Sequence, residues 1–356
     1  MHAVRLVKRP NGLPDPDQDF ALQREPQPTP ADVPPGHVLV RLRYLSMDPA
    51  MRGWMSSSEN SYLPPVELGA VMRGAAVGQV LFSRSPDFAE GDFVNALGAA
   101  WCQYAVFPSQ ALVRINPSPG VPLRAWAGLL GGSGLTAFFG LADVACLAPG
   151  ETVVVSAAAG AVGSAAAQLA KHVFGCRVVG IAGGRDKCEF LVRDLGLDAA
   201  VDYRSPTFAK DLRAALPKAG MDVFFDNVGG KVLDTALRCL ALDARVVLCG
   251  AVSQMNGNQE PIANLMNLVV KSARMEGFVL IRYRHRYAEA LARLCEWVAQ
   301  GKLKLVDEVV PGLDRAPRAM LRLFGCGPAT RGKLVVDMFP NEPEWVVAPL
   351  SGGGKL

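Results

Sequence analysis

The chain has 356 residues, of which 50% are hydrophobic and 20% charged, so its composition excludes a disordered chain and provides for a large buried core. Its net charge is +4, from 37 Lys and Arg against 33 Asp and Glu, with no run of five like charges, so nothing indicates a nucleic-acid-binding surface. At about 100 to 200 residues per domain, this length favours two domains.

Targeting segments and metal motifs are not evident in the sequence. The first residues lack the apolar core of a secretory signal, and no apolar stretch reaches the roughly 18 residues of a membrane helix, so we expect a soluble cytoplasmic protein. The eight Cys residues are scattered without a CxxC pair, and the four His residues lie far from one another and from the Cys residues. This pattern is typical of reduced, mostly buried cysteines, and it argues against disulfides and a metal site.

The first 127 residues are predicted to form a β-rich substrate domain. They are rich in Pro and Gly and contain short β-type runs such as Val38–Tyr44, in which apolar and charged residues alternate. Because a period of two is typical of a strand with one exposed face, we expect a compact, half-exposed β domain.

From about residue 150, short apolar strands alternate with helical stretches. This alternation is typical of a parallel sheet covered on both faces, and six strands match the doubly wound α/β nucleotide-binding fold. The predicted strands are Thr152–Val155, Arg177–Ile181, Ala199–Asp202, Asp222–Asp226, Arg245–Cys249 and Met275–Leu280. The predicted helices lie near 161–174, 186–195, 207–216, 230–241 and 286–300.

The segment after residue 301 returns to β-type sequence, with Leu305–Val310 and Lys333–Val336 as predicted strands. We therefore predict that residues 301–340 complete the domain begun by residues 1–127. The α/β domain at 128–300 is then inserted between the two parts, and residues 341–356 form a C-terminal tail.

A glycine turn follows the first strand of the α/β domain, where residues 156–164 read SAAAGAVGS. Aligned with the pattern G-x-G-x-x-G, Ala158 takes the first glycine position, and Gly160 and Gly163 take the second and third. Gly160 lets the backbone approach a pyrophosphate, Gly163 lets the helix pack close to the strand, and the free N–H groups of that helix face the phosphates. The βα units that follow favour a dinucleotide-binding Rossmann domain over a turn of small residues made for packing alone.

The second strand lacks the acidic residue that holds the adenosine ribose in NAD-binding domains. Its end is small, including Gly183, and the cations Arg185 and Lys187 follow at once. A 2′-phosphate could pair with Lys187 or Arg185, at about 1.5 to 3 kcal/mol per charge-assisted bond. The sequence therefore predicts NADP(H) over NAD(H). The alternative is that both cations are ordinary solvated residues in the first turn of a helix.

Five motifs, in order along the chain, resemble those of one family: Tyr44–Arg52, Met72–Gly78, Gly134–Leu141, Ala159–Ser164 and Phe225–Gly230. The chain resembles the zinc-independent medium-chain dehydrogenase/reductases. Within them it is most similar to the prostaglandin reductase, or leukotriene B4 12-hydroxydehydrogenase, group of NADPH-dependent alkenal/one oxidoreductases. The likeness runs from about residue 35 to 338. It implies a GroES-like fold for the β-rich domain and a homodimer formed through the α/β domain.

The resemblance implies NADPH-dependent reduction of the carbon–carbon double bond of a small α,β-unsaturated aldehyde or ketone, a reaction of the EC 1.3.1 type. It places the pyrophosphate at Ala161, Val162, Gly163 and Ser164, and the 2′-phosphate at Lys187 and Tyr203, the latter at the end of the third strand. Asn227 would lie beside the nicotinamide. The remaining predicted cofactor residues are Thr136, Gly160, Gly183, Cys249, Gly250, Ala251, Val252, Ser253, Met255, Phe278, Val279, Leu280, Thr330 and Gly332.

The sequence departs from the prostaglandin reductase pattern at four positions. Met255, Val270 and Ala50 stand where that group commonly has tyrosines, and Thr330 replaces an asparagine before Gly332. The first three changes remove hydroxyl donors, so eicosanoid substrates do not follow from the resemblance. The bacterial-style members, with broader enal and enone specificity, are the better comparison.

Hydride addition to the β carbon leaves negative charge on the carbonyl oxygen. One hydrogen-bond donor to that oxygen stabilises the transition state by about 3 to 4 kcal/mol. The candidates in the chain are the hydroxyls of Tyr44, Tyr62 and Ser253 and a backbone N–H near Ser253 to Met255, besides the ribose 2′-hydroxyl of the cofactor. No His is placed by motif as a general acid, so we expect the proton on the α carbon to come from solvent.

Alternative interpretations stay open for several residues and for the function. Tyr44 could cap the β domain, Asp48 and Arg52 could pair across a helical turn, Asn227 could be a turn residue, and Cys249 could be a buried small side chain. The chain could also be an NADPH quinone oxidoreductase or a non-catalytic NADPH-binding sensor. The absence of a Gly-His-Glu element and of a cysteine-rich lobe disfavours a zinc alcohol dehydrogenase.

Overall fold

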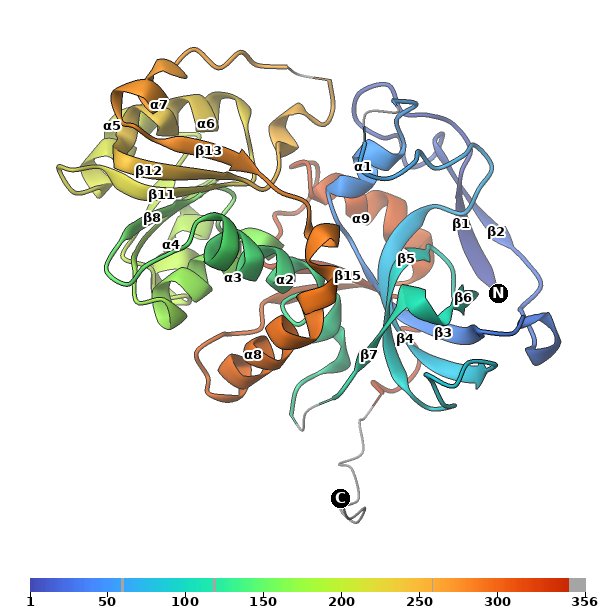
Figure 1. The fold of residues 1–356 in the computed structure, drawn as a ribbon. Coiled ribbons are helices and arrows are strands. Elements are labelled where there is room, and N and C mark those ends of the chain that lie inside the picture. The colour runs from blue at the N-terminus through green and yellow to red at the C-terminus, as the bar shows by residue number, and fades with distance from the viewer. Residues whose placement is uncertain (59–60, 118–119, 258, 346–356) are drawn as a thin grey trace, which may run out of the picture.

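The computed structural model describes residues 1–58, 61–117, 120–257 and 259–345 (Figure 1). Its α/β part is built on a six-stranded parallel sheet with the strand order β10-β9-β8-β11-β12-β13. In chain order this is the doubly wound arrangement 3-2-1-4-5-6, which confirms the predicted fold class. The strands are β8 (Thr152–Val155), β9 (Arg177–Ala182), β10 (Ala199–Asp202), β11 (Met221–Asp226), β12 (Leu240–Leu248) and β13 (Arg274–Gly277).

The first strand, β8, shows why this sheet is buried on both faces. Val153 and Val155 belong to one apolar core, and Val154, pointing the opposite way, belongs to another. Helices on the two faces complete the two cores (Figure 1). The first core includes residues of α2 (Gly132–Phe139), α3 (Ala161–Gln168), α4 (Arg185–Arg193) and α8 (Tyr287–Ala299); the second includes residues of α5 (Phe208–Ala215) and α6 (Gly230–Ala236).

Several element boundaries differ from the predicted ones. The helix predicted at 230–241 is shorter, because β12 already begins at Leu240, which pairs with Met221 of β11. The strand predicted at Met275–Leu280 ends at Gly277, so Phe278–Leu280 lie beyond the sheet. In the α/β part, two helices, α2 and α7 (Met266–Val270), were not predicted. Glycines at the start of α2 conceal it, because glycine is a poor helix former.

The second sheet combines strands from both ends of the chain, in the order β14-β15-β3-β4-β5-β7, with β6 paired to β3. β15 runs antiparallel to β3, so the chain returns to this sheet after the α/β part. A separate two-stranded sheet pairs β1 (His2–Leu6) with β2 (Phe20–Arg24). The larger sheet contains β3 (His37–Ser46), β4 (Arg73–Ser83), β5 (Phe93–Ala100), β6 (Tyr104–Pro108), β7 (Leu112–Ile115), β14 (Asp307–Pro311) and β15 (Lys333–Asp337), and the short helices α1 (Ala50–Trp54) and α9 (Ala316–Arg322) accompany it. The domain boundaries at 127/128 and 300/301 stay a prediction.

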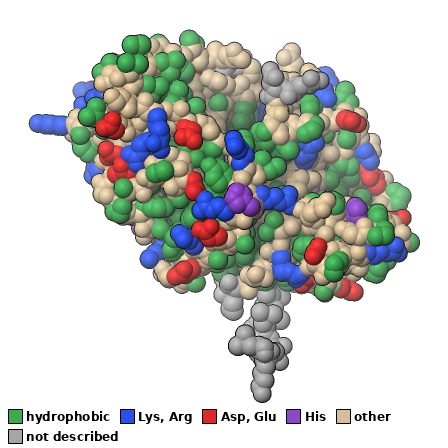
Figure 2. Space-filling model, in the orientation of Figure 1, with side chains coloured by type: hydrophobic (Ala, Val, Ile, Leu, Met, Phe, Trp, Pro, Cys, Tyr) green, Lys and Arg blue, Asp and Glu red, His purple; other side chains and the backbone are tan. Residues whose placement is uncertain are grey.

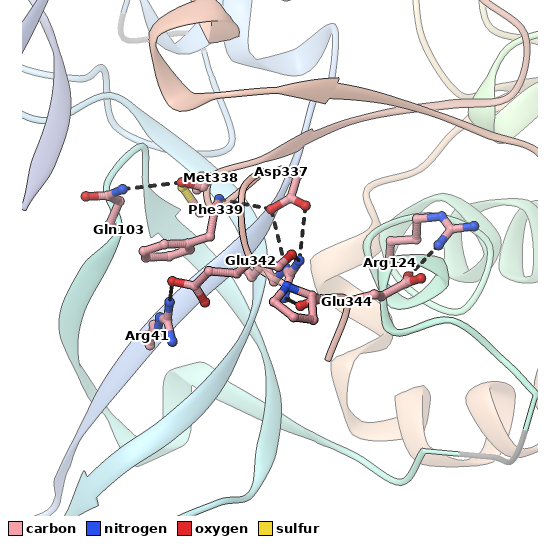
Figure 3. A network of polar contacts seen from close by, with 10 residues as sticks. Arg41, Gln103, Arg124, Asp337, Met338, Phe339, Glu342 and Glu344 are labelled. Carbon is pink, nitrogen blue, oxygen red and sulfur yellow. Dashed lines mark hydrogen bonds and ion pairs between the residues drawn. The ribbon is translucent and has the colours of Figure 1, made fainter. Parts of the chain in front are cut away.

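The strand β3 is not half-exposed, as its alternating sequence predicted. Most of its residues are buried, including Arg43. β3 pairs with β4, β6 and β15, and the segment that follows β15 bonds to side chains of β3. Figure 3 shows this segment held by Gln103, Arg41 and Arg124. The predicted tail at 341–356 is therefore anchored through residue 345, and its remainder lies outside the described residues.

The guanidinium group of Arg43 is the buried centre of this attachment. Its Nε lies 3.3 Å from a carboxylate oxygen of Asp337, and the group also donates to the carbonyl oxygens of Pro343 at 2.5 Å and Glu342 at 3.0 Å. Arg43 is 1% exposed, so its charge is compensated by protein groups rather than by water.

Arg43→Met should lower the free energy of unfolding by about 3 to 5 kcal/mol, because it leaves the Asp337 carboxylate buried without its partner. Arg318→Met is the control, since it removes an ion pair to Asp17 whose side chains are 66% and 70% exposed, and should cost less than about 1 kcal/mol. Urea denaturation measures both variants. Equal losses in the two would contradict the structural role of Arg43.

Candidate functional site

The glycine turn joins β8 to α3 in a close packing. Ala157 has φ +47°, in the left-handed region, and Gly160 caps the helix. A Cβ on Gly163 would lie 2.1 Å from the carbonyl oxygen of Ala157, so only glycine fits there. The first helical bond runs from the Ser164 N–H to the Gly160 carbonyl at 2.8 Å, which leaves the N–H groups of residues 161–163 without intrahelical partners. This is the arrangement the sequence predicted for holding a pyrophosphate.

A buried carboxylate links this turn to the end of β11. Asp226 accepts bonds from the Ser156 hydroxyl at 2.7 Å and from the N–H groups of Val228 at 3.0 Å and Gly229 at 2.9 Å. Burial raises the pKa of Asp226, and these donors oppose the rise. The Asn227 amide donates to the Ser156 carbonyl at 2.7 Å, so Asn227 has the structural role that was its alternative interpretation. Its place beside a nicotinamide stays a prediction.

The segment after β12 lies along residues 226–228. The N–H groups of Cys249 and Gly250 donate to the Asp226 carbonyl at 2.8 and 3.1 Å, and Val252 N–H donates to the Asn227 carbonyl at 3.2 Å. The structure thus brings the predicted residues Cys249 to Ser253 to the carboxyl edge of the sheet, beside the glycine turn. Burial raises the pKa of the Cys249 thiol to about 12, which suits a small buried side chain rather than a redox thiolate.

Ser253 and its neighbours do not offer the free donors that the sequence predicted. The Ser253 hydroxyl donates to the Val228 carbonyl at 2.7 Å, and the Ser253 N–H donates to the same oxygen at 3.1 Å. The N–H groups of Gln254 and Met255 donate to the carbonyls of Ala251 and Val252 at 3.0 and 3.4 Å. In this structure these donors are engaged with the backbone, and a contact between them and a substrate oxygen stays a prediction.

The two candidate tyrosines lie in different surroundings. Tyr44 is 2% exposed in the apolar core, where burial raises its pKa to about 12 and leaves little surface for a substrate. Tyr62 is 53% exposed, yet desolvation raises its pKa, and the carboxylate of Asp48 raises it further; the uncharged thiol of Cys249 also lies nearby. Because Cys249 follows β12, Tyr62 lies where the two sheets meet.

The alternative in which Asp48 and Arg52 pair across a helical turn is wrong. The Arg52 guanidinium donates to the Gly12 carbonyl at 3.0 and 2.9 Å, fastening the N-terminal loop to α1. Asp48 pairs instead with Lys333, whose Nζ lies 2.5 Å from its carboxylate and 3.0 Å from the Met47 carbonyl. Asp48 thus serves the contact between β3 and β15.

The turn after β9 brings Gly183, Lys187 and Tyr203 together. A Cβ on Gly183 would lie 2.8 Å from the Tyr203 ring and 3.0 Å from Nε of Arg204. Tyr203 follows directly on β10, whose bounds Ala199–Asp202 are those predicted. Arg185 pairs with Glu189 at 2.7 Å with its side chain 87% exposed, so it is the solvated helix residue of the alternative interpretation. Burial lowers the pKa of Lys187, and Arg204 lowers it further.

The remaining predicted residues are divided between α2 and the C-terminal segment. The Thr136 hydroxyl donates to the Gly132 carbonyl at 2.7 Å within α2, and a Cβ on Gly140, one turn further on, would lie 3.0 Å from the Phe278 ring. Val279 and Leu280 follow Phe278 and are half-buried. Gly332, next to Arg331 and after Thr330, donates its N–H to the Ala159 carbonyl at 2.8 Å and so reaches the glycine turn.

Two cations near this site were not predicted, Arg204 and Arg331. Arg204 follows Tyr203 and Arg331 precedes Gly332, both of them predicted cofactor residues. A positive charge next to such a residue is the sequence signal from which they could have been predicted. Their proximity to Lys187 depends on the tertiary structure.

Within the described ranges, no group of three or more His, Cys, Asp or Glu side chains could hold a metal ion. No helix in that part of the chain is long and apolar enough to cross a bilayer. A hollow of about 300 Å³ lies at His172, Arg193 and Lys302, and none of the predicted site residues lines it.

Comparisons with known proteins match both sheets. A family model described as the N-terminal domain of oxidoreductase matches residues 2–115, and one described as zinc-binding dehydrogenase matches residues 161–296. The chain is 40% identical over 327 residues to the NADPH-dependent curcumin reductase of Escherichia coli, covering 90% of this chain and 92% of that protein. It is 40% identical over 292 residues to the 2-alkenal reductase (NADP⁺-dependent) of Nicotiana tabacum, covering 81% and 83%.

Among solved structures, CurA from Vibrio vulnificus in complex with NADPH is similar to this chain, with a TM-score of 0.86 and 38% identity. The similarity covers 96% of this chain and 100% of that one. It therefore includes both the parallel sheet and the mixed sheet.

Gly163→Ala should destabilise the protein by about 1 to 3 kcal/mol, because its methyl group would overlap the backbone of Ala157 and push α3 away from β8. Gly160→Ala is the matched control, since its methyl group would meet only the Ala157 carbonyl oxygen, at 3.2 Å. Thermal unfolding measures both. A Gly163→Ala variant as stable as Gly160→Ala would contradict the close packing.

Proposed function

Because the chain belongs to the zinc-independent medium-chain dehydrogenase/reductase family, we propose that it reduces the carbon–carbon double bond of α,β-unsaturated aldehydes and ketones with NADPH. The observation that carries this is the 40% identity, over 90% of the chain, to an NADPH-dependent curcumin reductase. The 2-alkenal reductase of tobacco supports the same class of substrate.

The residues at the carboxyl edge of the parallel sheet fit NADP(H). The free N–H groups of residues 161–163 are suited to the pyrophosphate. Lys187 has no ion-pair partner among the described residues, so its charge is suited to the 2′-phosphate. The turn at Gly183 carries no carboxylate, which would repel that phosphate. When bound, NADPH supplies the hydride that adds to the β carbon of the substrate.

Tyr62 is the proposed donor to the carbonyl oxygen of the substrate. Its phenol is protonated at neutral pH, since desolvation raises a pKa that is ordinarily near 10, and its half-exposed side chain lies near Cys249, which follows β12. A hydrogen bond from this hydroxyl would stabilise the negative charge that develops on the oxygen, a contribution of about 3 to 4 kcal/mol. Tyr44 is too deeply buried and Ser253 too fully engaged for this role, so the α-carbon proton is assigned to solvent.

The purified protein should consume NADPH when an enal or enone is added, and much more slowly with quinones or with NADH. Lys187→Ala should raise KM for NADPH about 10- to 100-fold, the equivalent of one charge-assisted bond, and leave KM for NADH within about twofold. Arg185→Ala, whose side chain is solvated and paired with Glu189, should change neither. Loss of NADPH absorbance measures all three proteins.

Binding of NADPH without turnover across the whole panel would contradict the proposed activity and favour a sensor. Faster turnover with quinones than with enones would favour a quinone reductase. If the ratio of KM for NADPH to KM for NADH were unchanged in Lys187→Ala, only the role assigned to Lys187 would be contradicted.

A homodimer formed at the β13 edge of the parallel sheet is the proposed assembly. In the described part of the chain β13 pairs only with β12, which leaves its other edge able to bond to a second chain. Shortly before it, α7 exposes Met266, Val269 and Val270 at 67%, 70% and 68%. Figure 2 shows hydrophobic side chains gathered on the lobe that carries α7. A second copy of the chain would cover this hydrophobic patch. The cellular location is a separate expectation, and the cytoplasm stays the predicted one.

Replacing both Val269 and Val270 by Asp should convert the dimer to a monomer, because two charges would have to be desolvated in the interface. Val192→Asp is the control, since Val192 is an exposed apolar residue on α4, away from β13. Light scattering after size exclusion gives the mass. A monomeric wild-type protein, or a dimer that survives the double change, would contradict this assembly.

A further inference from the structure

We propose that Arg331 and Arg204 complete, with Lys187, a three-cation subsite for the 2′-phosphate of NADP(H), and that Arg331 brings to it a charge from the segment leading into the second sheet. The subsite then selects the cofactor through both parts of the fold. This inference rests on the proposed function, because it assigns residues to the phosphate group that distinguishes NADPH from NADH.

Arg331 is held against α4, the helix that carries Lys187. Its guanidinium lies 5.4 Å from the ring centroid of Phe190, which is three residues after Lys187 and therefore on the same side of α4. Backbone bonds fix this position from both sides. The Arg331 N–H donates to the Glu308 carboxylate at 2.8 Å, and the next residue, Gly332, donates to the Ala159 carbonyl of the glycine turn at 2.8 Å.

Arg204 approaches the start of α4 from the end of β10. Its Nε would be 3.0 Å from a Cβ on Gly183, and its guanidinium lies 5.7 Å from the ring centroid of Tyr203. The Arg204 N–H donates to the Asp202 carboxylate at 2.9 Å, and the same oxygen accepts the Gly184 N–H at 2.9 Å. Arg204 is therefore fixed beside the small-residue turn where a 2′-phosphate would lie.

The three side chains are not paired with carboxylates at ion-pair distance within the described residues. Neither Lys187 nor Arg204 nor Arg331 forms an ion pair there, whereas the carboxylate of Glu308 is taken by Arg322. The pKa of Lys187 is lowered first by burial and then by Arg204 and Arg331, with Glu308 opposing them, so both arginines lie close enough to Lys187 to repel its charge. A phosphate carrying nearly two negative charges would remove this repulsion.

A competing role for Arg331 is to stack on the adenine ring, because its guanidinium lies over Phe190 and could present its other face to a base. The two roles differ in their dependence on the 2′-phosphate. Stacking on adenine would serve NADH and NADPH equally, whereas the proposed ion pair serves NADPH alone.

The test uses calorimetric titration of the full chain with 2′,5′-ADP and with 5′-AMP, which differ in the 2′-phosphate. Arg331→Gln and Arg204→Gln should each weaken 2′,5′-ADP binding about tenfold or more and leave 5′-AMP binding within about twofold. Arg331→Lys should recover part of the loss, because a lysine restores the charge but not the planar donor geometry. Arg318→Gln, on α9 and paired with the exposed Asp17, is the control and should change neither affinity.

Unchanged 2′,5′-ADP binding in Arg331→Gln would overturn the proposal, as would equal weakening of both nucleotides. In either case, wild-type turnover of NADPH with enones would leave the proposed function standing. If the wild-type protein bound 2′,5′-ADP no more tightly than 5′-AMP and used NADPH no better than NADH, both the three-cation subsite and the proposed NADPH-dependent function would be overturned. Thermal unfolding of each variant serves as the control: a melting temperature like that of the wild type shows that a loss of nucleotide affinity does not come from loss of the fold.

Discussion

The buried carboxylate of Asp226 organises the carboxyl edge of the parallel sheet, on which the rest of the site depends. Its oxygens accept the Ser156 hydroxyl and the N–H groups of Val228 and Gly229, and its backbone carbonyl accepts those of Cys249 and Gly250. A carboxyl group that far from water is tolerated only when such hydrogen-bond donors surround it. The loops after β8, β11 and β12 are therefore held in one arrangement.

The C-terminal segment joins the two sheets through consecutive residues. Gly332 bonds to the glycine turn of the parallel sheet, and Lys333 bonds to Met47 and Asp48 at the end of β3. Gly332 has φ +67°, and a Cβ there would lie 2.1 Å from the Val306 carbonyl oxygen, so a glycine is required. The position of the glycine turn relative to the second sheet thus depends on a few bonds of Gly332 and Lys333.

The hydrogen-bond donors of the site fall into two sets, those already bonded within the protein and those available to a ligand. The Ser253 hydroxyl, the Thr136 hydroxyl in α2 and the side-chain amide of Asn227 all donate to backbone carbonyls and so hold these segments in place. The groups left for ligands are the first N–H groups of α3, the cations around α4 and the hydroxyl of Tyr62. A rigid frame with few free donors suits hydride transfer, in which orientation contributes more than acid–base chemistry.

The sequence by itself determined the parallel sheet, the glycine turn and the preference for a 2′-phosphate. These depend on local patterns: the apolar runs of β8 and β9, the spacing of Gly160 and Gly163, and Lys187 where a carboxylate is missing. Tertiary structure alone decided that the Ser253 hydroxyl donates a hydrogen bond to the Val228 carbonyl, that Asp48 pairs with Lys333, and that Arg331 lies against α4. Such pairings join residues far apart in the chain, and periodicity carries no information about which distant backbone atom a side chain will meet.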